Sequence, residues 1–435
     1  WDRFTSYYHK RLHEVAAFMV QPGQRILEIG CGTGDMLASL NPSYGVGVDF
    51  SAEMIKQARE RHPDMNFIEA DPHDLELKDV QSVFRKILPL TTSGTRIVIN
   101  FYSRLWELPL NFIRTLGLAK PMLLQNWLTV EDITGLLSLA DFEVISHREE
   151  IIWPLRTPVM DSFFNRFLAK IWPFKLLALT HFIIAKPVAT ALVNNELPTV
   201  SVIVPARNES GNIERIFERV PEMGKETELI FVEGGSTDDT YKAIEKTIAN
   251  NPHRPAKLFR QTGKGKGDAV RLGFNNAQGD ILMILDADLT VPPEDLPRFY
   301  DAIYRGKGEF VNGVRLVYPM EKEAMRFLNL AGNKFFSLVF SWLLGQPIKD
   351  TLCGTKVLWK KDYEKIAANR SYFGDFDPFG DFDLLFGAAK LNLKIVEIPI
   401  RYRERTYGTT IISRWKHGWL LLKMVFFALR RIKFV

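Results

Sequence analysis

Two stretches of this chain share one layout: a short apolar run, a turn rich in glycine or small polar residues, and then a helical segment. The first runs from Arg25 to Ile29 and leads into Gly30–Gly34, and the second runs from Thr199 to Val204 and leads into Pro205–Glu209. Continuous apolar runs are typical of parallel strands covered on both faces. The turn after such a strand is where doubly wound sheets bind nucleotides. The sequence therefore predicts an α/β protein with two doubly wound, Rossmann-like domains in series.

The composition agrees with this interpretation and excludes several others. With 435 residues, 46% of them apolar and 25% charged, the chain has room for two or three domains and is too apolar for wholesale disorder. The net charge of +5 is too small to indicate nucleic acid, and no such partner is expected. The two cysteines, Cys31 and Cys353, exclude a disulfide framework and a four-cysteine zinc site, and they fit a reducing compartment.

Neither a targeting segment nor a membrane span is predicted. The chain opens on Trp1-Asp2-Arg3-Phe4, without an initiator methionine or an apolar signal core, so we expect that its natural N-terminus was trimmed or lies outside this sequence. No run of about 18 uncharged apolar residues occurs, which argues against a transmembrane helix.

The first unit places acidic residues after its second and third strands. The predicted second strand, 44–48, ends at Asp49, and the third, 66–70, ends at Asp71. An acid after the second strand can accept hydrogen bonds from two ribose hydroxyls. Asp71 is placed to meet an adenine amino group. From the spacing alone, a Rossmann unit for another nucleotide stays open.

The run Glu28–Gly34, followed by Asp49 and then Asp71, closely resembles the class I S-adenosylmethionine-dependent methyltransferases. The resemblance covers residues 1–189 and implies that this domain binds S-adenosylmethionine. It also implies strands at 97–101, 142–145 and 180–185, the last two forming an antiparallel pair at the sheet edge. The residues that it places against the cofactor are Glu28, Gly30, Gly32, Gly34, Asp49 and Asp71.

The segment between Asp71 and Ile97 is too short for such a sheet. A doubly wound domain needs a helix, a fourth strand and another helix here, and the sequence has room for one helix at 80–88. Either the domain is shortened, or residues absent from this sequence belong near 77–80. Loss of a central strand would split the sheet and expose two strand edges. The methyl acceptor and its catalytic base are therefore not identified.

An aromatic insert, 154–178, precedes the last strand of the first unit and carries basic residues among its apolar ones. Its apolar face with a basic fringe suits a membrane surface, and packing against the neighbouring domain fits the spacing equally well. A short linker is predicted at 190–197.

The second unit continues with a strand at 228–232, which ends in Glu233, and with a basic glycine turn at 263–269. We expect Ser236 or Thr237 to cap the helix that follows Glu233. A further strand, 281–285, runs into Asp286-Ala287-Asp288. Two carboxylates one residue apart can hold Mg²⁺ or Mn²⁺ against a diphosphate, and the cation stabilises a departing nucleoside diphosphate.

The order of these motifs resembles the family 2 glycosyltransferases with the GT-A fold. We assign this domain to residues 198–412. Glu233 stands where the family usually has the first of two aspartates, and Gly234 replaces the second, so the choice between UDP and GDP is open. By this resemblance Asp286 and Asp288 hold the metal, and the nucleotide sugar is bound by Pro205, Ala206, Arg207, Glu209, Glu233, Gly267, Asp286 and Ala287.

Four further runs, 313–315, 349–354, 380–383 and 405–410, resemble the polyprenyl-phosphate sugar synthases, the group of dolichyl-phosphate mannose synthase. The resemblance implies that Arg315, Arg326 and Arg405 bind the lipid phosphate, and an arginine fork pairs with phosphate through two bonds. One departure is Thr290, where that group often has glutamine as a further metal ligand.

The acceptor determines whether a catalytic base is needed. A phosphate monoester is ionised near neutral pH, so its oxygen can attack the anomeric carbon with little help, and the configuration inverts. A hydroxyl acceptor would need a base. The resemblance favours Asp381 for this role, with Asp383 as the second choice among the acids of 373–383.

Two C-terminal segments bear on location. The segment 327–344 is typical of an interfacial or buried helix, and 413–435 contains no acid but interleaves tryptophan and phenylalanine with arginine and lysine. Such an amphipathic helix suits an anionic cytoplasmic leaflet. The alternative is docking on the protein or on a dimer partner. We expect a cytoplasmic protein, peripheral on the inner face of the membrane.

The sequence thus predicts a bifunctional enzyme: inverting, metal-dependent transfer of a sugar from a nucleotide sugar to a polyprenyl phosphate or lipid-linked acceptor, with methylation of the same or a related intermediate. A second hypothesis is a glycosyltransferase that extends a polysaccharide, with an O-methyltransferase that caps the glycan. A third makes the first unit a non-catalytic scaffold that docks the second at the membrane.

Overall fold

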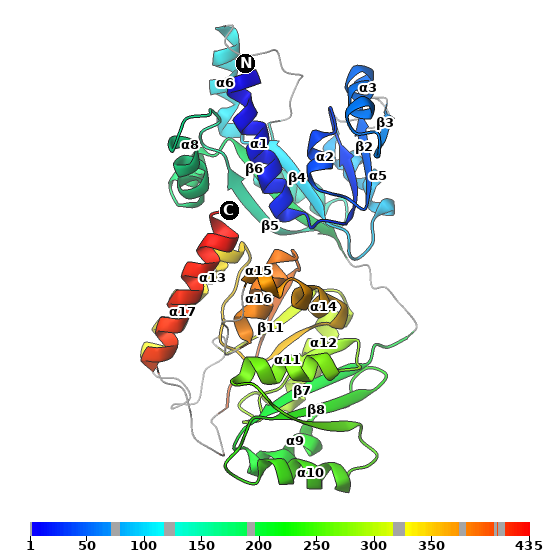
Figure 1. The fold of residues 1–435 in the computed structure, drawn as a ribbon, viewed down its shortest axis with the longest axis vertical. Helices are drawn as coiled ribbons and strands as arrows, with labels where there is room; N and C mark the ends of the chain where they lie inside the picture. Colours follow the sequence, from blue (N-terminus) through cyan, green and yellow to red (C-terminus); the bar gives the residue numbers. More distant parts are fainter. Residues whose placement is uncertain are drawn as a thin grey trace. The chain divides into compact units, whose positions relative to one another are not determined.

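The computed structural model describes residues 2–70, 79–116, 127–188, 196–315, 327–373, 380–403, 407 and 414–435. The chain divides into two compact units. Unit 1 comprises Trp1–Val188 together with Lys433–Val435, and unit 2 comprises Ala189–Ile432. Figure 1 shows the strands and helices of each unit.

Unit 1 begins with a parallel three-stranded sheet of order β1-β2-β3. Ser51 caps α3 by accepting a hydrogen bond from the Met54 N–H, as its position before a helix predicts. The elements are α1 (Asp2–Met19), β1 (Arg25–Ile29), α2 (Asp35–Ser39), β2 (Tyr44–Asp49), α3 (Ala52–Arg61) and β3 (Asn66–Glu69).

A second three-stranded sheet completes unit 1. Its order is β4-β6-β5, and β6 runs antiparallel to both neighbours, which confirms the antiparallel pair expected at the end of this unit. The larger elements are α5 (Val80–Ile87), β4 (Ile97–Tyr102), α6 (Glu107–Thr115), α7 (Val130–Ser138), β5 (Phe142–Glu150) and β6 (Thr180–Pro187). Short helical turns η1 (Leu88–Leu90), η2 (Arg104–Trp106), α8 (Met160–Ser162), η3 (Phe163–Phe167), η4 (Leu168–Lys170) and η5 (Phe174–Leu177) lie between them.

Among the described residues, the strands of unit 1 form two sheets rather than one doubly wound sheet. β1 and β4 are both edge strands of their sheets. The side chain of Leu27, in β1, is 47% exposed, although the first strand of a doubly wound sheet is normally covered on both faces. No strand of the described ranges joins β1 to β4. Residues 71–78, which include Asp71, lie outside the described part of the chain.

Unit 2 is built on one mixed seven-stranded sheet of order β13-β11-β12-β10-β7-β8-β9. β12 is antiparallel to both of its neighbours, and the other pairs are parallel. All residues of β8 and β10 are buried, as the apolar runs predict. The strands are β7 (Val200–Ala206), β8 (Thr227–Glu233), β9 (Ala256–Arg260), β10 (Ile281–Ile284), β11 (Phe310–Val314), β12 (Lys356–Trp359) and β13 (Ile395–Pro399).

Helices cover both faces of this sheet. Val202 points toward a core that contains residues of α9, α10 and α12, whereas its neighbour Ile203 meets Gly273 of α11 on the other face. The main helices are α9 (Ile213–Arg219), α10 (Thr240–Asn250), α11 (Lys266–Asn276), α12 (Leu296–Tyr304), α13 (Phe327–Leu344), α14 (Lys360–Ala368), α15 (Arg370–Phe373), α16 (Asp381–Lys390) and α17 (Arg414–Ala428). Short turns η6 (Ser210–Asn212), η7 (Pro293–Asp295) and η8 (Leu429–Lys433) complete the list.

The predicted C-terminal helices are present as α13 and α17, which lie against each other in unit 2 (Figure 1). Among the described helices, none combines the length and the apolar character that crossing a bilayer requires.

Candidate functional site

The two carboxylates predicted to hold a metal follow β10 at its carboxyl end, and each is held differently. Asp286 Oδ1 lies 2.5 Å from the Nζ of Lys266, the first residue of α11. Asp288 Oδ1 accepts hydrogen bonds from the Thr290 backbone N–H at 3.1 Å and from the Thr290 hydroxyl at 2.8 Å. Thr290 therefore fixes the orientation of the second carboxylate.

The environment of Asp286 favours its charged form. Burial alone would raise the pKa of Asp286, but Lys266, Lys356 and Arg315 outweigh it and hold this pKa below its usual value. The site is also tightly enclosed, since a Cβ added at Gly354 would collide with Asp286 Oδ2 and with Lys266 Nζ. A side chain at position 354 would therefore displace the Asp286 carboxylate or the Lys266 ammonium.

This arrangement fits a divalent cation. Magnesium and manganese take carboxylate oxygens together with phosphate oxygens and water. The ammonium of Lys266 beside Asp286 shows that the position accepts positive charge. Asp286 and Asp288 are thus suited to hold such an ion at a diphosphate.

The predicted nucleotide pocket lies where β7 and β8 end side by side. Ala206 pairs with Glu233 across the two strands, and the Gly234 N–H donates to the Ala206 carbonyl at 2.9 Å. Glu233 is buried, and its Oε1 accepts from the Ser236 N–H at 2.5 Å. The structure therefore brings together the ends of the two strands that the sequence analysis assigned to the base and its pocket.

Asn208 connects these two loops, a role that the sequence analysis missed. Its backbone N–H donates to Ser236 Oγ at 3.0 Å, and its Oδ1 accepts from the Thr237 N–H at 2.8 Å. Asn208 has a φ of 57°, a conformation that asparagine tolerates better than most residues. The expectation that Ser236 or Thr237 caps a helix was wrong, because α10 begins only at Thr240. The hydroxyls of Ser236 and Thr237 form hydrogen bonds with Asn208 instead.

The basic glycine turn meets the start of α16. A Cβ on Gly380 would lie 2.6 Å from the Cα of Gly267, and Gly380 has a φ of 71° that favours glycine. Asp381 is the first residue of α16, but its side chain lies outside the described part. Asp383 is buried, and its Oδ2 accepts from the Arg370 Nε–H at 2.9 Å. This ion pair anchors Asp383, the second-choice base of the sequence analysis.

Arg315 is engaged by a buried acid. Its Nε and Nη2 donate to the two oxygens of Asp350 at 2.7 and 2.8 Å, and its guanidinium lies 5.3 Å from the ring centre of Tyr402. Burial would lower the pKa of Arg315, but the Asp350 carboxylate raises it above its usual value. Nη1 is the guanidinium nitrogen that the two-bond pair does not use. Arg326 and Arg405, the other predicted phosphate ligands, lie outside the described residues.

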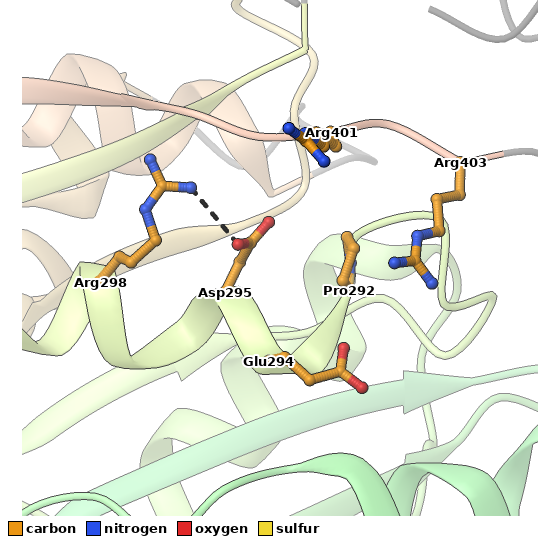
Figure 2. A pocket seen from close by; sticks show the side chains of 6 residues that line it. All are labelled: Pro292, Glu294, Asp295, Arg298, Arg401 and Arg403. Atoms are coloured by element: carbon orange, nitrogen blue, oxygen red, sulfur yellow. Dashed lines mark hydrogen bonds and ion pairs between the residues drawn. The ribbon is translucent and has the colours of Figure 1, made fainter.

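A pocket lined by charged residues borders the loop that carries Asp288, and the sequence analysis did not predict it. Figure 2 shows that Arg401 and Arg403, which follow β13, face the start of α12 across this pocket. The Arg403 N–H donates to the Thr290 carbonyl at 2.9 Å, so the segment is tied to the residue that orients Asp288. The lining residues are Pro292, Glu294, Asp295, Arg298, Arg401 and Arg403.

The glycine turn of unit 1 has the conformation that its sequence predicts. Gly30, Gly32 and Gly34 have φ values of 78°, 51° and 77°, which residues with a Cβ rarely adopt. The Gly32 N–H donates to Asp49 Oδ2 at 2.8 Å, and the Ser51 N–H donates to Asp49 Oδ1 at 3.0 Å. Asp49 thus joins the ends of β1 and β2 at the predicted cofactor edge.

Glu28 offers an unused acceptor at the same edge. Its Oε2 is buried and has no hydrogen-bond partner among the described residues. Burial raises the pKa of Glu28 to about 7. A hydrogen bond from the Leu37 backbone lowers this pKa, and the negative charge of Asp49 raises it further. A buried oxygen without a partner is costly unless a ligand donates to it. The turn therefore fits a ligand that carries hydrogen-bond donors.

Comparison with protein families assigns a domain to each unit. Residues 26–88 match the family model described as "Methyltransferase domain", and residues 201–367 match "Glycosyl transferase family 2". The first match includes Glu28, the glycine turn and Asp49, and the second includes the nucleotide pocket and the carboxylate pair. The chain thus has an N-terminal methyltransferase domain and a C-terminal family 2 glycosyltransferase domain, as the sequence motifs indicated.

Curated relatives resemble the second domain. A dolichol-phosphate mannosyltransferase of Pyrococcus furiosus is 31% identical over 236 residues, which are 52% of this chain and 64% of that protein. An undecaprenyl-phosphate 4-deoxy-4-formamido-L-arabinose transferase of Edwardsiella ictaluri is 32% identical over 230 residues, again 52% and 64%. The chain therefore spans slightly less than two thirds of the length of these relatives.

Among solved structures, glucosyl-3-phosphoglycerate synthase of Mycobacterium tuberculosis, in complex with Mn²⁺, uridine diphosphate and glucosyl-3-phosphoglycerate, is 19% identical. The match covers 54% of this chain and 80% of that one, with a TM-score of 0.39.

Proposed function

We propose that this chain, which joins a methyltransferase domain to a family 2 glycosyltransferase domain, transfers a sugar from a UDP- or GDP-sugar to a polyprenyl phosphate or another lipid-linked acceptor, with inversion at the anomeric carbon. The observation that carries the proposal is the carboxylate pair Asp286 and Asp288, placed at the end of a buried strand and beside Lys266. The names of the two relatives, one a dolichol-phosphate and one an undecaprenyl-phosphate transferase, support the acceptor class.

In this proposal the residues of the chain position a donor and an acceptor that need little further activation. When bound at Asp286 and Asp288, Mg²⁺ or Mn²⁺ supplies positive charge to the leaving diphosphate. Glu233 holds the base at the ends of β7 and β8, and Arg315 offers Nη1 toward an anionic acceptor. A phosphate acceptor is already ionised at neutral pH, so its oxygen attacks without a base, whereas a hydroxyl acceptor would use Asp381.

A donor screen tests the transfer. Purified protein is given labelled UDP- and GDP-sugars with polyprenyl phosphate, and wild type is compared with Asp288→Asn. Product from the wild type, lost in Asp288→Asn and on removal of divalent metal, is expected. Asp301→Asn is the matched control, because Asp301 forms an exposed pair with Arg305 on α12. Equal product from Asp288→Asn would refute the metal assignment. Product with glycan but not with polyprenyl phosphate would favour polysaccharide extension.

For unit 1 we propose that S-adenosylmethionine binds at the turn Gly30–Gly34 and that its methyl group goes to the same or a related lipid-linked intermediate. The buried, unpartnered oxygen of Glu28 supports a ligand at this turn. Titration calorimetry with S-adenosylmethionine tests binding, and mass spectrometry of the glycosylated lipid after incubation with the labelled cofactor tests transfer. Unlabelled lipid after efficient cofactor binding would remove the coupling of the two activities.

The scaffold hypothesis for unit 1 is favoured by one observation. Among the described strands, β1 and β4 are edges of two separate sheets, whereas a catalytic domain of this type would join them through a central strand. Micromolar binding of S-adenosylmethionine would exclude the scaffold, and binding that is millimolar or weaker would support it.

We also propose that unit 2 lies on the inner face of the cytoplasmic membrane through α17. Trp419, Leu422 and Phe426 are exposed at helical spacing, and Leu421 and Met424 on the other side of the helix are buried. Lys423 lies 5.9 Å from the Trp419 ring centre, and Arg430 lies 4.5 Å from that of Phe426. Such basic and aromatic pairs suit an anionic headgroup layer. A fall in vesicle affinity in Trp419→Ser/Phe426→Ser tests this placement.

A further inference from the structure

Unit 1 has an exposed apolar surface that neither its core nor its glycine turn explains. Leu105, Leu108, Phe112 and Leu116 are spaced by three and four residues, so they form one stripe along η2 and α6. Leu108 is 80% exposed and Phe112 is 65% exposed. The opposite stripe, with Trp106 and Leu110, packs against the core of unit 1. The outward stripe therefore has no partner within the described residues of its own unit.

The aromatic insert between β5 and β6 carries further exposed apolar side chains. Phe163 and Leu176 are exposed, and Trp172 is 73% exposed. The Trp106 Nε1–H donates to the Leu177 carbonyl at 3.0 Å, which joins the turn before α6 to the end of the insert. We call the exposed apolar side chains of the α6 stripe and of the insert the apolar lip. Its main members are Leu108, Phe112, Leu116, Phe163, Trp172 and Leu176.

The topology places the apolar lip at the carboxyl edge of the second sheet. Tyr102, the last residue of β4, and Glu150, the last of β5, both pair with Thr180, the first residue of β6. α6 leaves the sheet just after Tyr102, and the insert leaves it just after Glu150. In α/β domains ligands bind outside the carboxyl ends of the strands. The lip thus flanks the kind of edge at which an acceptor of the methyltransferase domain would enter.

The charged side chains around the apolar lip indicate what kind of surface it binds. The insert 154–178 carries four basic residues and one acid, Asp161, but Lys170 is buried against Glu150 and Lys175 pairs with Glu149 at 2.8 Å. Arg104, the first residue of η2, is exposed, as are Arg156 and Arg166 within the insert. Exposed tryptophan, phenylalanine and leucine beside arginines are the composition of interfacial segments, which bury apolar side chains below anionic headgroups. Large exposed apolar patches mark interaction or membrane sites more often than surfaces that meet only water.

We propose that the apolar lip of unit 1 docks on an anionic lipid bilayer, and that the methyl acceptor is a molecule held in that bilayer. The second half of this statement rests on the proposed methyltransferase function, but the docking itself does not. It gives unit 1 a membrane contact of its own, separate from α17. A water-soluble acceptor would gain nothing from this arrangement.

Site-specific probes on the full chain test the docking. Both native cysteines are buried, and burial raises the pKa of Cys31 to about 11 and that of Cys353 to about 12, so they react slowly with thiol reagents. An environment-sensitive dye is therefore attached to a cysteine introduced by Leu108→Cys or Trp172→Cys. Leu139→Cys is the matched control, because Leu139 is 64% exposed on the same unit but follows α7 rather than lining the lip.

With phosphatidylcholine vesicles that contain phosphatidylglycerol, dyes at positions 108 and 172 are expected to shift to the blue and to lose at least about tenfold in quenching by aqueous iodide. The dye at 139 stays unchanged, and neutral vesicles give a weaker shift. Dyes at 108 and 172 that stay accessible while the protein sediments with vesicles would overturn the proposal, as would failure to bind vesicles. A shift that grows with protein concentration without lipid would assign the lip to a second copy of the chain.

Two independent measurements separate this result from the proposed functions. Sugar transfer to detergent-dispersed acceptor and calorimetric binding of S-adenosylmethionine need no vesicle. If both are present while the dyes stay accessible, only the docking fails. If the dyes are buried while S-adenosylmethionine does not bind, the docking stands and the bilayer-held methyl acceptor is refuted.

Discussion

The two units carry similar strand-and-turn motifs, but the strands behind these motifs are packed very differently. In unit 2 the turn after β7 and the carboxylate pair after β10 extend from neighbouring strands in the middle of a seven-stranded sheet. In unit 1 the turn Gly30–Gly34 extends from β1, an edge strand whose Leu27 is half exposed. Since packing holds a site in its working geometry, the same motif is better evidence of function in unit 2 than in unit 1.

The largest effect on sugar transfer is expected at Gly354, where the packing around Asp286 is tightest. Gly354→Ala puts a methyl group into the space of Asp286 Oδ2 and Lys266 Nζ. Displacing either group moves the metal ligand, and we expect sugar transfer to fall by at least about a hundredfold. Gly332→Ala, where a Cβ meets nothing within 4 Å, is the control and should keep wild-type activity. Full activity of Gly354→Ala would show that Asp286 does not need the position it has here.

A matched pair of leucine substitutions tests the packing difference directly. Leu229 of β8 is fully buried, so Leu229→Ala should destabilise unit 2 by about 3 kcal/mol. Leu27→Ala in β1 should cost unit 1 less than about 1 kcal/mol, because this side chain is already half exposed. Hydrogen exchange of the strand amides measures each unit separately. A cost for Leu27→Ala as large as that for Leu229→Ala would mean that β1 is covered in solution.

The pH dependence of cofactor binding tests whether the turn of unit 1 works despite its edge position. The pKa of Glu28 is raised to about 7, so below pH 7 its carboxyl is increasingly protonated and loses an acceptor. We expect the affinity for S-adenosylmethionine to be constant above about pH 7 and to fall about tenfold per unit below it. Calorimetry at several pH values measures this, and Glu28→Gln should be independent of pH. A flat wild-type profile would remove Glu28 from the cofactor site.

The smallest effect concerns Thr290, the residue at which this sequence differs from the polyprenyl-phosphate sugar synthases. Thr290→Val removes the hydroxyl bond to Asp288 Oδ1 but keeps the backbone bond. We expect the metal concentration for half-maximal transfer to rise about tenfold with little change in maximal rate, which corresponds to the lower end of the about 1.5–3 kcal/mol of a bond to a charged group, because the backbone bond still orients Asp288. Thr290→Ser should restore the wild-type value. An unchanged metal requirement in Thr290→Val would make the hydroxyl dispensable.

Much of unit 2 could be predicted because its signals are local. Buried strands are recognisable as unbroken apolar runs, and the residues at their ends are known once the strand direction is known. Thus Ala206, Glu233 and Asp286 lie where the sequence analysis placed them. The cap at Ser236 was mispredicted because Asn208, far away in the sequence, competes for the same side chains.

The sequence by itself determined the strand ends, the glycine turn with its left-handed backbone, and the acidic pair, because each depends on residue type and short-range periodicity. The tertiary structure alone decided which groups meet them: Lys266 and Gly354 at Asp286, Arg315 at Asp350, and the apolar lip at the carboxyl edge of β4 and β5. The physical reason is that these contacts join residues far apart in the chain, and their geometry follows from strand order and packing, which no local pattern encodes.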